Sequence, residues 1–228
     1  MLSGKYFADG CRWVVDWMYP GRPMYSPLEA NYGDRVFLRG SAVYKFVQTK
    51  MGTRFNSRKK HIFVVHNSDQ PFDEGKLNAL LPYAIHIYAI NTTVKHPRLT
   101  TVPLGFPDAA LDFVANFKRP DVPRDIEIYL NFSVNTNVQK RMDCYNAFKD
   151  DPRVVIKGDR TREQYYEDLC RSKYVLCPEG TGMDTHRVWE AIFCGATPVV
   201  LRNPLADLYS AYPVKIMDSW TDLMQVQS

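Results

Sequence analysis

The stretch that decides the fold is SKYVLCPEGTGMDTHRVWEAIFCGATPVVL, residues 172–201. It begins with an apolar run, Tyr174–Cys177, which leads into a glycine-bearing loop at Pro178–Met183. A helical pattern follows over Asp184–Cys194, and a second apolar run occupies Thr197–Leu201. Short, nearly continuous apolar runs are typical of strands that are buried on both faces of a parallel sheet. The stretch therefore predicts a strand, a crossover helix and a second parallel strand.

The same alternation continues towards the N-terminus. Four further apolar runs are bounded by turn or breaker residues, and two further segments have helical periodicity. The runs are His61–His66, Ala84–Ile90, Ile126–Phe132 and Val154–Ile156, and the helical segments are Val138–Phe148 and Thr161–Ser172. The spacing of Thr161 and Gln164 is that of a capping box. Strands alternating with helices indicate an α/β protein, whereas residues 1–40 show no clear period.

The best candidate for a domain boundary is Phe117–Asp125 (FKRPDVPRD), which contains two prolines and alternating charges and precedes a new strand. We therefore expect two α/β domains, residues 1–120 and residues 125–228. Parallel sheets that face each other across a cleft would direct the carboxyl ends of their strands into it, and α/β proteins bind ligands there.

Composition excludes several classes of protein. The 228 residues are 45% hydrophobic and 24% charged, which excludes a disordered chain. The 29 basic and 25 acidic residues leave a net charge of +4, which is too mild for a nucleic-acid partner but favours a small anionic ligand. The basic stretch Arg54–Lys60 is interpreted as a solvated flank of the strand that follows it.

The five cysteines are scattered without metal-binding or disulfide-framework spacing, and no apolar run approaches the 18 or so residues of a membrane span. The N-terminus carries no apolar leader pattern. We therefore expect no metal site, no transmembrane segment and a reducing, cytoplasmic location.

The loop and helix of residues 178–194 predict an anion site. Gly180 and Gly182 let the backbone approach a ligand closely, and Asp184 or Thr185 can cap the helix. Unpaired N–H groups and the helix dipole attract anions to such a helix start.

Three charged or polar side chains share one face of this helix, because His186, Arg187 and Glu190 are related by i, i+3 and i, i+4 spacing. Arg187 suits a phosphate oxygen, and Glu190 can accept hydrogen bonds from two sugar hydroxyls. Together they predict a site for a nucleoside diphosphate. The plainer alternative is a surface ion pair between Arg187 and Glu190.

The run SKYVLCPEGTGMDTHRVWEAIFCGATPVV resembles the donor-binding segment of exostosin-like glycosyltransferases and their bacterial and viral relatives. It contains their S-K/R-aromatic, P-x-G, H/S-R-x-x-E-A and G-x-x-P-V elements. Further stretches that fit are HNSD at His66–Asp69, NTTVKHPRLTTVPLG at Asn91–Gly105, and Asn131-Phe132-Ser133 followed by Arg141. The resemblance spans roughly residues 60–218.

The resemblance implies a GT-B-like enzyme with two Rossmann-like domains, in which the C-terminal domain holds a nucleotide sugar and the N-terminal domain receives the acceptor. It assigns Glu190 to the ribose, and Arg187 to the diphosphate. The remaining donor-side candidates are Gly180, Thr181, Gly182, Asp184, His186, Asn131, Ser133 and Arg141, with Glu179 as a candidate sugar contact. Arg141 and Glu179 could equally be solvated surface residues.

The implied reaction displaces a nucleoside diphosphate from an anomeric carbon. The helix start and arginine would stabilise the departing phosphates, and the sequence contains no Asp-x-Asp motif. We therefore expect metal-independent activity without a cofactor. Inversion also requires a general base, for which Asp69 and His66 are the main candidates and Asp73 and Glu74 weaker ones. His66 could instead be a structural histidine, and Asn67-Ser68-Asp69 could be an ordinary turn.

The sequence thus predicts an inverting glycosyltransferase that uses a nucleotide sugar, such as UDP-xylose, and a glycan or glycoprotein acceptor. The alternative is a non-catalytic module that binds a nucleotide sugar or a glycan. The absence of G-x-G-x-x-G and G-x-S-x-G disfavours a Rossmann oxidoreductase and a serine hydrolase. Only eight residues follow Trp220, where GT-B enzymes usually have a helix that returns to the first domain. We expect either a minimal closure or one module of a longer protein.

Overall fold

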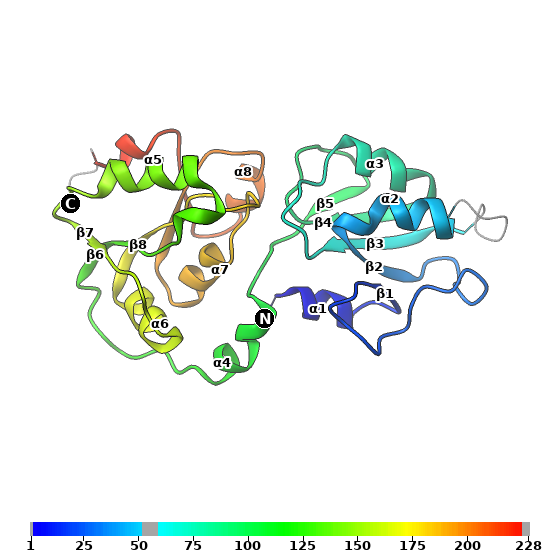
Figure 1. Ribbon diagram of the computed structural model, residues 1–228, viewed down its shortest axis with the longest axis horizontal. Helices are drawn as coiled ribbons and strands as arrows, with labels where there is room; N and C mark the ends of the chain where they lie inside the picture. The colour runs from blue at the N-terminus through cyan, green and yellow to red at the C-terminus, as the bar shows by residue number, and fades with distance from the viewer. Residues whose placement is uncertain (1, 52–58, 225–228) are drawn as a thin grey trace. The chain divides into compact units, whose positions relative to one another are not determined.

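The computed structural model describes residues 2–51 and 59–224, and the chain divides into two compact units, Met1–Asp108 and Ala109–Ser228. Each unit contains a parallel five-stranded sheet with helices packed on it (Figure 1). The predicted α/β class with two Rossmann-like domains is therefore confirmed. Most of the basic stretch Arg54–Lys60 lies outside the described residues.

The sheet of the first unit has the order β1-β2-β3-β4-β5. Its strands are β1 (Trp13–Val15), β2 (Arg35–Arg39), β3 (His61–His66), β4 (Ala84–Ala89) and β5 (Leu99–Thr101). The helices are α1 (Gly4–Asp9), α2 (Val43–Phe46) and α3 (Glu74–Leu80). Because Arg39 pairs in register with His66, the ends of β2 and β3 lie at the same edge of the sheet.

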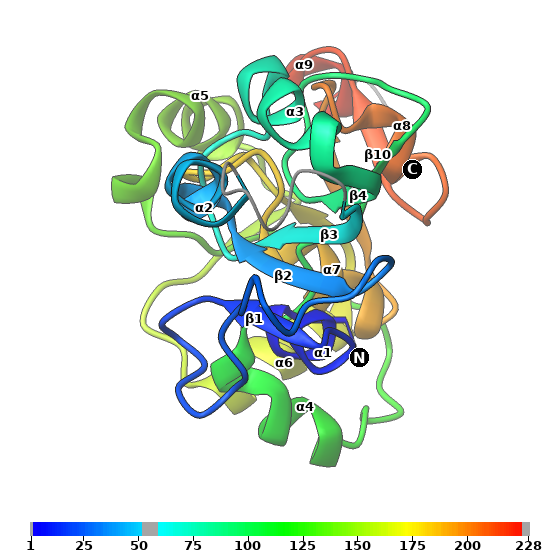
Figure 2. The same cartoon turned by 90° about the vertical axis from the view of Figure 1, so that its right-hand side faces the viewer.

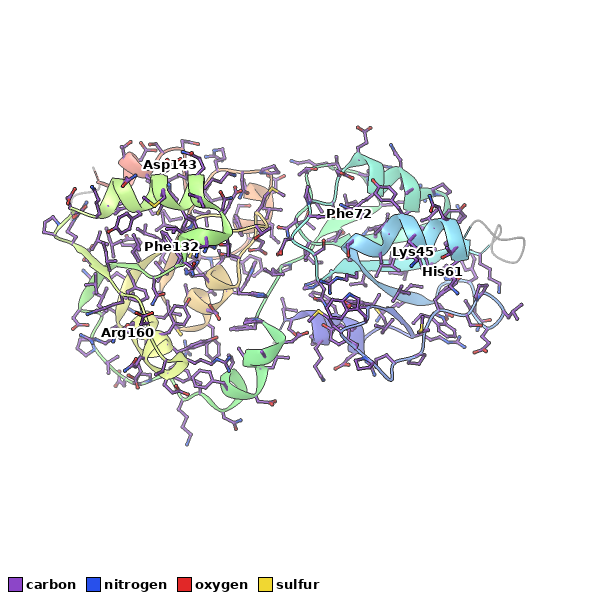
Figure 3. The ribbon with its side chains drawn as sticks, viewed as in Figure 1. Lys45, His61, Phe72, Phe132, Asp143 and Arg160 are labelled. Atoms are coloured by element: carbon purple, nitrogen blue, oxygen red, sulfur yellow. The ribbon has the colours of Figure 1, made fainter. Side chains whose placement is uncertain are left out.

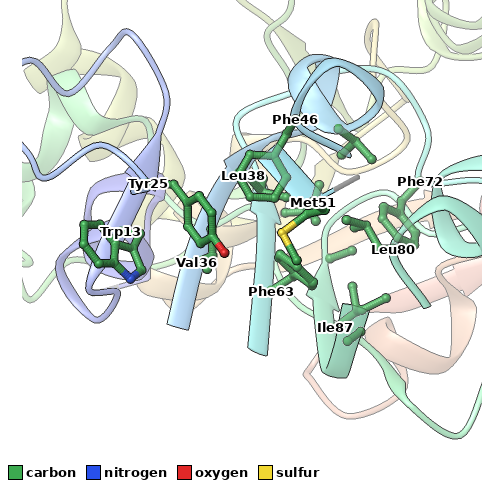
Figure 4. Close-up of a cluster of buried hydrophobic side chains, with 14 of the residues drawn as sticks. Trp13, Tyr25, Val36, Leu38, Phe46, Met51, Phe63, Phe72, Leu80 and Ile87 are labelled. Carbon is green, nitrogen blue, oxygen red and sulfur yellow. The ribbon is translucent and has the colours of Figure 1, made fainter. Parts of the chain in front are cut away.

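Alternation along the strands divides the apolar residues of this unit between the two faces of the sheet. Leu38 and Phe63 point to the face covered by α2 and α3, where they form the main core with residues such as Phe46 (Figure 4). Phe37 and Val64 pack with residues of α1, which lies on the other side of the sheet from α2 (Figure 2). Two layers of helix thus hold the sheet between them.

The sheet of the second unit has the order β10-β9-β8-β6-β7. Its strands are β6 (Ile126–Leu130), β7 (Val154–Ile156), β8 (Ser172–Leu176), β9 (Thr197–Leu201) and β10 (Lys215–Met217). The helices are α4 (Leu111–Asn116), α5 (Val138–Phe148), α6 (Arg162–Arg171), α7 (His186–Phe193), α8 (Ala206–Tyr209) and α9 (Trp220–Met224). The strand order changes direction between β6 and β8, which makes this the switch point of the sheet.

Local sequence explains where the helices of the second unit begin. Thr161 and Gln164 form the predicted capping box at the start of α6. The side chain of Asn137 accepts a hydrogen bond from the backbone of Lys140 and begins α5 directly after the loop that follows β6. Phe148 of α5 then packs edge-on against Trp220, with ring centroids 6.0 Å apart.

The division between the units lies earlier than the predicted boundary at Phe117–Asp125. Phe113 and Phe117 pack against Tyr166, with ring centroids 5.0 and 5.4 Å apart, so this segment belongs to the second unit. The first 40 residues, which gave no pattern, contain α1, β1 and β2. In the described part of the chain, the longest apolar helical segments are too short to cross a membrane.

Candidate functional site

The residues predicted to bind the donor gather at the switch point of the second unit. The loops that follow β6 and β8 leave the sheet side by side at the carboxyl ends of these adjacent strands. Asn131 and Ser133 belong to the first loop, and Gly180, Thr181 and Gly182 belong to the second. Open parallel sheets bind ligands at this position.

Direct hydrogen bonds join the two loops. The Nε of Arg141 donates to the carbonyl of Glu179 at 3.1 Å, and its Nη1 donates to the carbonyl of Ser133. The amide of Asn137 donates to the carbonyl of Gly180 at 2.9 Å. A Cβ atom at Gly180 would lie 2.8 Å from Nη2 of Arg141, so a glycine allows the arginine to lie against the loop. Arg141 is therefore buried in the site and is not a solvated helix residue.

A second arginine lies beside the first. The guanidinium carbons of Arg141 and Arg187 are each 5.6 Å from the centroid of the Phe132 ring, which Figure 3 labels in the second unit. Burial, reinforced by the charge of Arg187, lowers the pKa of Arg141 to about 10. Two partly desolvated cations at one ring favour the binding of an anion between or beside them.

The first turn of α7 leaves two polar atoms unsatisfied. Among the described residues, Nε of Arg187 and Oγ1 of Thr185 are buried without a hydrogen-bond partner. Thr185 is the N-cap residue, but its side chain forms no capping bond. Unpaired buried donors at a helix start are what an anionic ligand would satisfy.

Of the two residues predicted as possible caps, Thr185 takes the N-cap position of α7 and Asp184 lies just before it. The helix begins at His186, not at Asp184, and the buried carboxylate of Asp184 accepts hydrogen bonds from Nε1 of Trp189 at 3.0 Å and from the hydroxyl of Tyr209 at 3.1 Å. These contacts fasten α7 to α8. The carboxylate of Asp184 is therefore engaged by residues of α7 and α8.

Glu190 lies one turn into α7 and is mostly buried. Its two carboxylate oxygens accept one hydrogen bond each, from the hydroxyls of Tyr165 at 3.0 Å and Tyr166 at 3.1 Å. Burial and the charge of Glu190 raise the pKa of both tyrosines, so both remain hydrogen-bond donors. Since a carboxylate offers about four acceptor positions, Glu190 retains capacity for further donors such as sugar hydroxyls.

Glu179 is held in place and is not a free loop carboxylate. It forms an ion pair with Lys140 of α5 and accepts a hydrogen bond from Nδ2 of Asn203 at 3.0 Å. It lines a pocket of about 440 Å³ whose walls also include Asp143 of α5 and Trp220 (Figure 3 labels Asp143).

The remaining donor-side candidates occupy the rim of the site. Asn131 donates to the hydroxyl of Tyr129 at 2.9 Å, and Tyr129 in turn donates to Asp168 at 3.0 Å. The side chain of Ser133 accepts from the backbone of Asn135. Thr181 is exposed and contacts the first loop, while His186 is half-buried as the first residue of α7.

The two candidate bases belong to the first unit, at the carboxyl end of β3. His66 is 1% exposed, and its ring nitrogens lie 2.9 Å from Oδ1 of Asn67 and 3.4 Å from the carbonyl of Pro103. These contacts give His66 a structural environment. Asp69 is exposed, so its carboxylate is accessible to an acceptor hydroxyl. The weaker candidate Asp73 is the N-cap residue of α3 and accepts from the backbone of Lys76.

Three aromatic residues of the site have no counterpart among the predicted site residues. They are Phe132, Tyr165 and Tyr166. Phe132 belongs to the Asn131-Phe132-Ser133 stretch that fits the family pattern, but its contact with Arg141 and Arg187 brings together residues from three segments. The tyrosine pair in the predicted helix Thr161–Ser172 was the available signal, since buried tyrosines usually find a hydrogen-bond partner.

Comparison with known proteins bears on the second unit. Residues 125–226 match the family model described as the RXYLT1 C-terminal domain. The probable beta-1,4-xylosyltransferase IRX10 of Arabidopsis thaliana is 33% identical over 107 residues, which cover 41% of this chain and 26% of that protein. The resemblance to exostosin-like glycosyltransferases is confirmed.

Other exostosin-like relatives carry related names. A probable glucuronosyltransferase of Oryza sativa subsp. japonica, Os01g0926700, is 32% identical over 102 residues, covering 39% of this chain and 24% of the relative. The probable glucuronosyltransferase GUT1 of the same plant is 29% identical over 101 residues, covering 40% and 24%. The chain thus matches about a quarter of the length of these curated relatives.

The described residues contain no group of three or more His, Cys, Asp or Glu side chains that could hold a metal ion. Arg141 and Arg187 supply positive charge at the candidate donor site.

Proposed function

We propose that this chain is a glycosyltransferase that moves a sugar from a nucleoside-diphosphate donor to a glycan acceptor. The observation that carries the proposal is the pair formed by Arg141 of α5 and Arg187 in the first turn of α7, because the buried Nε of Arg187 has no partner among the described residues. The glycosyltransferase names of the relatives support the same function. By analogy with IRX10 we propose UDP-xylose as the first donor to test.

In this proposal the diphosphate lies at the first turn of α7 and contacts Arg187 and Arg141. Charge-assisted hydrogen bonds of this kind are stronger than neutral ones. The ribose lies one turn further along, where its hydroxyls donate to the free acceptor positions of Glu190. Tyr165 and Tyr166 then orient that carboxylate, because each of them already holds one oxygen.

The proposed chemistry is an inverting displacement. An acceptor hydroxyl attacks the anomeric carbon of the donor sugar, and the bond from that carbon to the phosphate oxygen breaks. The electron pair leaves with the diphosphate, whose charge the two arginines stabilise. Asp69 takes the hydroxyl proton. We propose that the reaction proceeds without a metal ion, because the arginines supply positive charge where it is needed.

A reducing, cytoplasmic location is also part of the proposal. All five cysteines are free, and Cys144, Cys170, Cys177 and Cys194 are buried. Burial raises the pKa of Cys177 to about 12, so this thiol is unreactive at neutral pH.

Calorimetric titration tests the donor site. UDP, GDP, CMP and ADP are titrated into the protein, once with EDTA and once with magnesium. The proteins are the wild type, Arg187→Gln and the control Arg171→Gln, which alters an exposed ion pair with Asp125. We expect UDP to bind wild type and control equally, to bind Arg187→Gln about tenfold or more weakly, and to need no metal. No binding of any nucleotide would contradict the proposal.

Transfer from UDP-xylose to xylo-oligosaccharides is then measured on the proteins that bind UDP. Transfer of xylose would support the proposed glycosyltransferase activity. Binding of UDP without hydrolysis or transfer would favour the alternative, a non-catalytic nucleotide-sugar-binding module.

A further inference from the structure

A polar network joins the ends of three adjacent strands in the first unit. Asp16 follows β1, and its fully buried carboxylate accepts hydrogen bonds from Nη1 of Arg39 at 3.4 Å and from Nδ2 of Asn67 at 2.9 Å. Arg39 is the last residue of β2, and Asn67 directly follows β3. A buried carboxylate with these partners fixes the three strand ends relative to one another.

The network also determines the backbone of the HNSD segment. Asn67 has a φ of 53°, a conformation that costs energy for a residue other than glycine. Its side chain donates to Asp16 and to the hydroxyl of Tyr19 at 2.8 Å. A Cβ atom at Gly4 would collide with the side-chain amide of Asn67, so the glycine leaves room for this side chain. These hydrogen bonds hold the backbone at Asn67, and thereby fix the start of the loop that carries Asp69.

An exposed tryptophan, Trp17, lies next to Asp16 and Arg39 of this network. Trp17 is 76% exposed, although it immediately follows the buried Asp16. The guanidinium carbon of Arg39 lies 4.7 Å from the centroid of the indole ring. A cation–π contact of this kind favours one orientation of the ring. The large exposed fraction leaves indole surface free for a ligand.

Trp17 and Asp69 lie at the same edge of the sheet, because both follow the carboxyl ends of parallel strands. One strand, β2, separates them, which corresponds to about 10 Å at the usual strand spacing. The end of β2 closely approaches the HNSD segment, since a Cβ atom at Gly40 would lie 2.6 Å from Cβ of Ser68. A sugar ring on Trp17 would thus be about one or two sugar residues from Asp69.

We propose that Trp17 is a stacking platform for a pyranose ring of the glycan acceptor, oriented by Arg39 and Asp16. The C–H groups on one face of a pyranose carry partial positive charge and match the negative face of an indole. Arg39, with its side chain 23% exposed, can donate to hydroxyls at the ring edge. This inference rests on the proposed function, because it concerns the acceptor of that reaction.

The test compares Trp17→Ala with wild type and with Tyr32→Ala. Tyr32 is a matched control because it is 68% exposed and lies just before β2, at the opposite edge of the sheet. Xylotetraose is the probe, chosen from the xylosyltransferase name of the relative IRX10. The KM for xylotetraose with UDP-xylose, equilibrium binding of xylotetraose and the affinity for UDP are measured on each protein.

We expect Trp17→Ala to raise the KM and the dissociation constant for xylotetraose about tenfold. The kcat, the affinity for UDP and the melting temperature should stay at wild-type values. Trp17→Phe should retain part of the wild-type affinity for xylotetraose. Unchanged xylotetraose binding by Trp17→Ala would overturn the platform, as would a wild type that binds UDP but not xylotetraose. A wild type that binds xylotetraose through Trp17 but no nucleotide would instead contradict the proposed function alone.

Discussion

The guanidinium groups of Arg141 and Arg187 contact the same ring, that of Phe132, each at 5.6 Å from its centroid. Arg141 comes from α5 and Arg187 from α7, so the pair forms only when both helices pack on the sheet. Arg141 is already hydrogen-bonded to the loops after β6 and β8. Arg187 has the unsatisfied atom, and it is therefore the arginine with more to gain from a ligand.

This difference predicts unequal effects on folding and binding. Arg187→Gln should weaken binding of UDP without loss of stability, because it removes repulsion between two cations. Arg141→Gln should weaken binding and also destabilise the protein by roughly 1–3 kcal/mol, since the two loops lose their bridge. Urea denaturation and calorimetry of both variants measure the two effects. Equal stability losses in the two variants would contradict the distinction.

Glu190 is predicted to recognise ribose. Glu190→Ala should weaken binding of UDP about tenfold or more and remove any preference for UDP over 2′-deoxy-UDP. It leaves the hydroxyls of Tyr165 and Tyr166 without their acceptor, so we expect a stability loss of about 2–4 kcal/mol but a folded chain. Glu163→Ala, at an exposed position of α6, is the control. A variant that still prefers UDP to its deoxy analogue would rule out the ribose role.

Much of this arrangement could be predicted from the sequence. The strand–loop–helix–strand order of residues 172–201 follows from breaker residues and apolar runs that are buried on both faces. The spacing of Arg187 and Glu190 already places them on one side of a helix. The capping box at Thr161 is a local interaction and formed as expected.

The remainder depends on tertiary packing. The contact of Asp184 with Tyr209 depends on the position of α8, which local spacing does not contain. The contact of Tyr166 with Glu190 likewise arises only when α6 and α7 pack together. Strand β2 was missed because its outer residues, Arg35 and Arg39, are charged and interrupt the apolar pattern.

Asp69 is predicted to be the general base. Asp69→Asn keeps the shape of an exposed side chain but removes its ability to take a proton. We therefore expect wild-type affinity for UDP and a loss of transfer by a factor of roughly 100 or more. His66→Gln serves as the comparison, because a buried residue with two occupied nitrogens should affect stability more than chemistry. Normal transfer by Asp69→Asn would exclude Asp69 as the base.

Asp184 is predicted to be structural, although it lies in the donor-binding segment. Asp184→Ala removes the acceptor of Trp189 and Tyr209 in a buried site, and two unpaired donors should cost about 2–4 kcal/mol. Asp150→Ala, whose carboxylate is 89% exposed, should change stability by less than about 0.5 kcal/mol. Urea denaturation measures both. Because the carboxylate of Asp184 is turned towards α8, UDP affinity of the folded fraction should stay near that of the wild type. A tenfold loss of UDP affinity at unchanged stability would show instead that Asp184 takes part in nucleotide binding.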